Sequence, residues 1–249
     1  MTDLISTNDL MAHVCPKIGD LGWAYYFTPE TMARGNELGL DGLRFYFLGR
    51  GGVLGDVESG VVHSAFGYFE RGFVDKMWNS AKTVVAPRQA GREYVACAAG
   101  HGRRKLGGSD GLDAYNAAAT AVDAAADDAG LSLYAAASCE PFVDDAPGRA
   151  MQLTALLREL RGSAHLLAVR AVGLTPLQAH VIKRPGDLAM FGWTDADAPE
   201  VTDELVRLRA EAEALTDELL APAYGVLDAD GQQALIAGID AIEVALTAS

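Results

Sequence analysis

Residues 174–193 read LTPLQAHVIKRPGDLAMFGW, and this stretch decides how the fold of the whole chain is interpreted. Thr175-Pro176 is a typical helix start and Pro185-Gly186 a typical helix end, so the sequence predicts a short helix between them. Before it, apolar residues recur in steps of four, three, four and three from Leu153 to Leu167, which predicts a long amphipathic helix. The two helices follow each other with a short connection.

Two such helices are typical of the opening of a winged helix-turn-helix unit, in which a recognition helix and a β-hairpin wing come next. Here residues 194–200, Thr-Asp-Ala-Asp-Ala-Pro-Glu, lead from Phe191-Gly192-Trp193 directly into a long acidic helix. That helix has a heptad-like apolar stripe over Leu205–Leu219 and charge pairs four residues apart, such as Arg209 with Glu213. We therefore predict that the second recognition helix and its wing are missing.

The rest of the chain also has helical patterns, with few alternating runs of valine or isoleucine that would indicate strands. The other helices are expected from Thr28 to Gly39, from Asp41 to Leu48, over 62–69, 73–78 and 88–105, from Ser109 to Gly130, and over 235–246. Arg50–Gly55 is expected to be a glycine-rich turn, and residues 131–148 an irregular crossover. The predicted fold class is mainly α: two fused winged-helix-like helical units, residues 1–135 and 136–249, with a degenerate second wing and long C-terminal helices.

Charge is unevenly distributed along the chain, whose net charge is −14. Residues 110–145 carry eight acids and no base, and residues 195–249 carry thirteen acids and two bases. Residues 41–110 carry ten bases and seven acids, so only the middle of the chain attracts anions. This balance disfavours general attraction to nucleic acid or to an anionic membrane surface.

Cysteine and histidine spacing gives no sign of a disulfide framework or a metal site. Cys15, Cys97 and Cys139 are odd in number and widely separated, and the five histidines lack metal-ligand spacing. Neither a signal peptide nor an apolar run of ~20 residues, long enough to span a bilayer, is visible. We therefore expect a cytoplasmic protein with no membrane partner and no metal, and the sequence names no cofactor.

Several short groups of residues, in order along most of the chain, resemble those of one family. They are Arg50 with Val53-Leu54-Gly55, Leu131–Ala136, Leu156–Glu159 with Arg161-Gly162 and His165, Gly192-Trp193, and Leu215–Leu219. In these groups the chain resembles the actinobacterial SalAB/EvbL-like helix-turn-helix family, whose members are similar to two fused winged-helix units of the MarR type. The resemblance implies a DNA-reading helix and wing, which members carry in a longer segment after the Gly-Trp pair. Because that segment is short here, we expect DNA binding to be weakened or lost.

Arg158, Arg161 and His165 are the first candidate site residues, because a spacing of three and four places them on one face of a helix. Two guanidinium groups can clamp a carboxylate or a phosphate, and a nearby imidazole can donate or transfer a proton. Arg50, in the first half of the chain, could join them. This stripe therefore predicts an anion-binding pocket between the two halves.

Tyr46 and Trp193 are the aromatic candidates for the same pocket. The structural alternative has the greater weight. In it the arginines cap backbone carbonyls or pair with Glu159 and Asp187 and join the two halves, while the aromatic residues are ordinary core.

The leading functional interpretation is a small-molecule-binding protein on a helix-turn-helix-derived scaffold, with an anionic or aromatic ligand in a cleft between the halves. One alternative is a transcriptional regulator that binds DNA as a dimer, through its first half. Another is an enzyme recruited from this scaffold, using the face of Arg158, Arg161 and His165. The sequence leaves open whether any reaction is catalysed.

Overall fold

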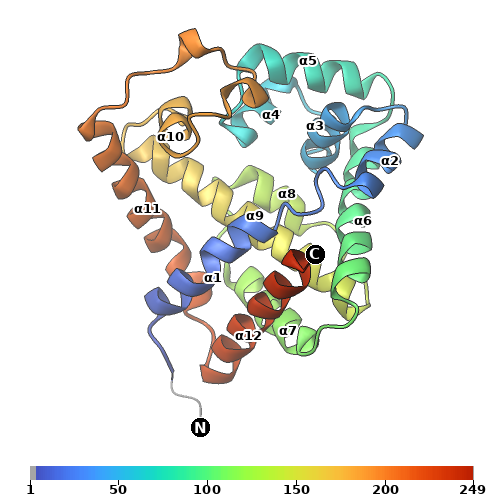
Figure 1. The fold of residues 1–249 in the computed structure, drawn as a ribbon, viewed down its shortest axis with the longest axis vertical. Coiled ribbons are helices and arrows are strands. Elements are labelled where there is room, and N and C mark those ends of the chain that lie inside the picture. Colours follow the sequence, from blue (N-terminus) through green and yellow to red (C-terminus); the bar gives the residue numbers. More distant parts are fainter. Residues whose placement is uncertain (1–3, 249) are drawn as a thin grey trace.

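The computed structural model describes residues 4–248, and all regular secondary structure in this range is helical (Figure 1). The elements are α1 (Thr7–Leu21), α2 (Pro29–Glu37), α3 (Gly42–Gly52), α4 (Ser59–Phe66), α5 (Arg71–Lys82), α6 (Pro87–Leu106), α7 (Leu112–Ala125), α8 (Ser132–Ser138), α9 (Ala146–Ala171), α10 (Pro176–Lys183), the 3-10 helices η1 (Leu188–Phe191) and η2 (Asp195–Asp197), α11 (Asp203–Tyr224) and α12 (Ala229–Thr247). The predicted mainly α fold class is confirmed. None of these helices combines the length and the apolar character needed to cross a membrane.

Three helix starts lie where the sequence predicts them, and each has its capping hydrogen bond. The Thr28 side chain accepts from the backbone N–H of Thr31 at the start of α2, and Asp41 accepts from that of Arg44 at the start of α3. At α10, Thr175 and Gln178 form a reciprocal capping box. These bonds satisfy backbone donors that the first turn of a helix leaves without partners.

The turn expected at Arg50–Gly55 begins later than predicted, because α3 continues through Arg50 and ends at Gly52. The turn itself follows at Val53 and Leu54 and leads to Gly55, whose φ is 90°. Gly51 and Gly52, which lie inside α3, serve close packing instead. A Cβ on Gly52 would lie 2.1 Å from the carbonyl oxygen of Pro87 in α6, so only glycine lets the two backbones approach this closely.

Three other boundaries differ from expectation. The expected crossover over 131–148 contains α8, which forms because Leu133 and Tyr134 are buried against the core. The helix expected from Ser109 to Gly130 is shorter, with Gly111 in the left-handed region before α7. The helix expected over 62–69 ends at Phe66, where Gly67 has a φ of 72°.

The long helix α9 runs through the middle of the molecule and organises the core (Figure 1). It packs against α6 and α7 on one side and against α1 and α11 on the other. Its predicted apolar stripe is buried from Leu153 to Ala164, whereas Leu167 at its end is exposed. The main core includes residues from both predicted units, and the boundary between residues 1–135 and 136–249 stays a prediction.

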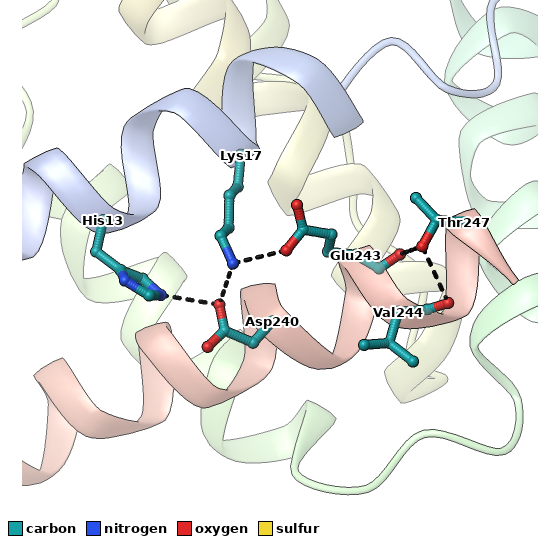
Figure 2. Close-up of polar contacts among 6 residues, drawn as sticks. All are labelled: His13, Lys17, Asp240, Glu243, Val244 and Thr247. Atoms are coloured by element: carbon teal, nitrogen blue, oxygen red, sulfur yellow. Dashed lines mark hydrogen bonds and ion pairs between the residues drawn. The ribbon is translucent and has the colours of Figure 1, made fainter.

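Helices α1 and α12, near the two ends of the chain, are held side by side by a small polar network (Figure 2). Lys17 on α1 donates to Asp240 at 2.7 Å and to Glu243 at 2.6 Å, both on α12. His13 lies 2.9 Å from the same Asp240 oxygen. These contacts add a polar rim to the apolar packing between the two helices.

The segment after Trp193 is where the sequence predicts a missing DNA-reading element. Between Trp193 and Asp203 the chain forms only η2 and an extended connection to α11. No residue from 4 to 248 belongs to a β-strand, so a β-wing is found in neither half of the described chain.

Candidate functional site

A cleft of about 450 Å³ lies between α9 and the helices around it, with a size typical of sites for small organic molecules. Segments from α1, α3, α4, α9, α10, α11 and η1 line it. Five of the six candidate site residues lie in its wall: Tyr46, Arg50, Arg158, Arg161 and His165. The spacing of the last three on α9 thus places them on one open face, as the sequence indicates.

One end of the cleft is formed by a buried ion pair between α3 and α9. Arg50 donates from Nε and one terminal nitrogen to the two oxygens of Glu159, at 2.9 and 2.7 Å. Tyr26 donates to Glu159 at 2.8 Å and accepts from Arg158 at 3.0 Å, and Tyr46 accepts from Arg50 at 3.1 Å. A bidentate pair of this kind fixes direction as well as distance. The structural alternative for Arg50 is therefore confirmed with respect to Glu159.

The charges at this end hold Glu159 ionised. Burial raises the pKa of this carboxyl, but the charge and hydrogen bonds of Arg50, together with Arg158 and Tyr26, outweigh it and lower the pKa to about 2. Burial also raises the pKa of Tyr26, which keeps its phenol neutral and able to donate.

Asp187, the other expected partner, forms no ion pair within 4.0 Å in the described part of the chain.

The opposite end of the cleft is formed by α9, α10 and α11. There Arg161 donates to Glu213 at 2.8 Å and Arg209 donates to the other oxygen of Glu213 at 2.5 Å. The pair of Arg209 with Glu213, predicted from its spacing on α11, is confirmed. Burial raises the pKa of Glu213, but His165 and the two guanidinium groups lower it to about 2 overall. One carboxylate thus serves two arginines.

His165 is buried beside this cluster in one definite tautomer. Its Nδ1 lies 2.8 Å from Thr216 Oγ1, and the Thr216 hydroxyl donates to the carbonyl of Ala212 at 2.6 Å. Because that hydroxyl has only one hydrogen, Nδ1 of His165 must carry the proton and donate. Burial and the nearby Arg209 lower the pKa of His165 to about 4, so the imidazole is neutral at neutral pH.

Replacing His165 with glutamine should therefore reduce the loss of unfolding free energy as the pH falls below 7. The folded pKa is below the ordinary value of about 6.5, so from neutral pH downward the unfolded state takes up a proton that the folded state does not. The wild type should lose about 2 kcal/mol of unfolding free energy through this group between pH 7 and pH 5. Urea unfolding at both pH values measures the difference, and equal losses in wild type and His165→Gln would contradict it.

Two further cations of the cleft, Lys183 and Arg184 at the end of α10, are not among the site residues predicted from the sequence. Lys183 and Arg184 are exposed at the cleft and form no ion pair within 4.0 Å with any residue from 4 to 248. Desolvation and the nearby guanidinium groups lower the pKa of Lys183. The sequence predicts a helix that ends at these two residues, but no sequence pattern shows which cation lacks an acidic partner.

Positive charge is in excess over the whole cleft, whereas the chain as a whole carries a net charge of −14. Six cations line it against three carboxylates, an excess of three, with the histidines neutral. The cations are Arg50, Arg158, Arg161, Lys183, Arg184 and Arg209, and the acids are Asp20, Glu159 and Glu213.

A continuous series of aromatic rings forms the apolar wall of the cleft. Phe191 of η1 stacks on Phe69 with ring centroids 4.5 Å apart, and His180 of α10 lies 4.2 Å from Phe191. Phe69 in turn lies 6.0 Å from Tyr46, beside Arg50. The wall thus runs from the cations of α10 to the ion pair between α3 and α9. A flat apolar group placed along it would contact ring faces or edges.

Trp193, the sixth candidate, is not among the residues that line the cleft. Its indole Nε1 donates to the backbone carbonyl of Tyr68 at 2.9 Å. The contact ties the segment after η1 to the loop that follows α4, so Trp193 supports the aromatic wall from outside. Within residues 4–248, no three His, Cys, Asp or Glu side chains come together as a metal site would require.

A model of a helix-turn-helix family matches residues 13–195, which include most of α1, all of α2 to η1 and most of the cleft lining. The matched region ends at Asp195, within the acidic segment that connects Trp193 to α11. No curated protein and no solved structure matches the chain. Because the family model covers most of its length, the chain belongs to this helix-turn-helix family.

Proposed function

We propose that the chain binds a small anionic molecule in the cleft between α9 and its neighbours. The observation that carries the proposal is the excess of three cations in this cleft, in a protein whose net charge is −14. A concave wall of one charge sign with low-dielectric surroundings concentrates ions of the opposite sign. The geometry therefore favours an anion there over any other partner.

The state of the individual cations supports the same proposal. Arg50 and Arg158 already form ion pairs with Glu159, so they mainly shape their end of the cleft. Lys183 and Arg184 form no ion pair with an acid in residues 4–248, and both are exposed to a ligand that enters the cleft. A ligand carboxylate or phosphate would supply the missing partner without displacing a side chain of the protein.

A second candidate function, a DNA-binding regulator, is supported by membership of the helix-turn-helix family. Within that family we place the chain with the SalAB/EvbL-like proteins, on the residue groups that it shares with them. The corner between α9 and α10 also exposes cations, with Arg170, Lys183 and Arg184 at the surface. These cations could contact phosphates as a positioning surface rather than read bases.

Isothermal titration with two simple acids, benzoate and phenyl phosphate, tests the anion proposal. We expect at least one of them to bind, and Lys183→Met to weaken that binding about tenfold, as expected for loss of one charge-assisted contact. Lys105→Met is the matched control, because Lys105 is exposed at the end of α6, outside the cleft lining. It removes the same charge and should leave the affinity unchanged.

Two results would decide against this function. Absence of heat with either acid at millimolar concentration overturns the anion proposal, and equal weakening by Lys183→Met and Lys105→Met overturns the location. A mobility shift with duplex DNA at low salt, lost steeply as salt rises, would favour the regulator instead.

A further inference from the structure

We infer that the anionic group of the ligand is a phosphate monoester, held at the end of the cleft formed by α9, α10 and α11. The inference rests on the proposed function, since it names the class of molecule that would occupy the same site. It depends on three properties of this end of the cleft: its charge, its supply of hydrogen-bond acceptors and the aromatic wall beside it.

The charge at this end exceeds what one carboxylate neutralises. Among the residues that line this end, Arg161, Lys183, Arg184 and Arg209 are matched by a single acid, Glu213, which leaves an excess of three cations. A carboxylate ligand supplies one negative charge, whereas a phosphate monoester supplies about 1.5 to 2 at neutral pH. At the other end of the cleft, two arginines share Glu159 and have two tyrosine hydroxyls as further acceptors. Little positive charge is therefore left unneutralised there.

Hydrogen-bond acceptors are also too few at the α10 end. Each oxygen of Glu213 already accepts from one guanidinium group. The Nε groups of Arg161 and Arg209 are buried without a hydrogen-bond partner. Buried donors without acceptors are costly. A phosphate brings three strong acceptor oxygens to the exposed donors at this end, the ammonium of Lys183 and the guanidinium of Arg184.

The remainder of the ligand is indicated by the aromatic wall. The ring of His180 lies 4.2 Å from Phe191, which stacks on Phe69, so the apolar surface begins directly beside the cations. A phosphate bound by Lys183 would place its ester group against these rings. The class of molecule is therefore a phosphate monoester of an aromatic or otherwise flat apolar alcohol, with phenyl phosphate as its simplest probe.

The test compares phenyl phosphate with benzoate, by isothermal titration with the full chain at pH 7.5 and at pH 5. We expect phenyl phosphate to bind at least tenfold more tightly at pH 7.5. Its affinity should fall several-fold at pH 5, because the second ionisation of a phosphate monoester lies near pH 6. Benzoate, which stays singly charged, should change little. Lys183→Met should reduce this preference for phosphate, and Lys105→Met should preserve it.

Titration of the protein groups that face the phosphate acts on both acids, so benzoate serves as the control for it. On α9 and α11, His165 has a pKa lowered to about 4 and Glu213 one lowered to about 2, and both lie beside the guanidinium groups of Arg161 and Arg209. On α10, burial lowers the pKa of His180, which also lies in the field of Asp187. Burial raises the pKa of Asp217 on α11, near Arg161, and beside α4 it raises the pKa of Tyr68 to about 12. A change with pH that is specific to phenyl phosphate therefore reports the ligand.

Each outcome separates this inference from the proposed function. Benzoate binding as tightly as phenyl phosphate, or phenyl phosphate binding with no loss at pH 5, overturns the phosphate inference and leaves anion binding intact. A lack of binding by both acids overturns both. A preference for phosphate that persists in Lys183→Met overturns the assignment to the α10 end.

Discussion

Replacing Glu159 with alanine should lower the free energy of unfolding by about 3–5 kcal/mol, the range measured when one partner of a buried ion pair is removed. Glu159 is buried, and its two oxygens accept from Arg50, Arg158 and Tyr26. Without the carboxylate, the Arg50 side chain, itself 13% exposed, would remain in the interior without a countercharge. Denaturant unfolding monitored by circular dichroism measures the loss.

Two controls show whether the effect comes from the buried charge. Glu211→Ala removes a carboxylate from an exposed pair with Arg207 on α11 and should cost less than about 1 kcal/mol. The double variant Arg50→Met/Glu159→Met removes both charges and should be more stable than Glu159→Ala, since paired buried charges can often be replaced by apolar groups. If Glu159→Ala were no more harmful than Glu211→Ala, the ion pair would not hold α3 to α9.

The same pair sets a pH window. Because the folded pKa of Glu159 is about 2, below the ordinary value for glutamate, the stabilisation is complete above the unfolded pKa of about 4.3. It is lost as the pH falls from there toward 2. Wild type and Glu159→Gln should therefore converge in stability at the acid end of this window.

Local patterns predicted much of the fold because their causes are local. The caps at Thr28, Asp41 and Thr175 each need only a side chain within three residues of a free backbone donor. The common face of Arg158 and Arg161 follows from helix geometry alone. Such features could be placed before any tertiary contact was known.

The partners at the site could not be predicted, because they depend on contacts distant in sequence. Glu159 meets Arg50 across 109 residues and Tyr26 across 133, and no local spacing encodes either contact. The unpaired state of Lys183 depends in the same way on which acids α9 and α11 bring to α10. Sequence reasoning therefore found the arginines of the cleft but not which cations remain free for a ligand.

Gly52→Ala should destabilise the protein by about 3 kcal/mol or more, at the upper end of what overpacking costs, because the added methyl group would meet backbone rather than a movable side chain. Its Cβ would lie 2.1 Å from the carbonyl oxygen of Pro87 and 3.0 Å from the amide nitrogen of Gly91, both on α6. Backbone atoms in a helix cannot turn aside as a side chain can. The only relief is separation of α3 from α6, two helices that are closely packed along their length.

Gly162→Ala, on the exposed surface of α9, is the matched control, because its Cβ would meet nothing within 4 Å. There alanine should stabilise by up to about 1 kcal/mol through its higher helix propensity. The same substitution should thus have opposite signs in two helices, and thermal unfolding of both variants measures this directly. Since α3 carries Tyr46 and Arg50, its displacement in Gly52→Ala should also weaken ligand binding at the cleft. A stable Gly52→Ala would mean that the backbones of α3 and α6 are not in contact at this point.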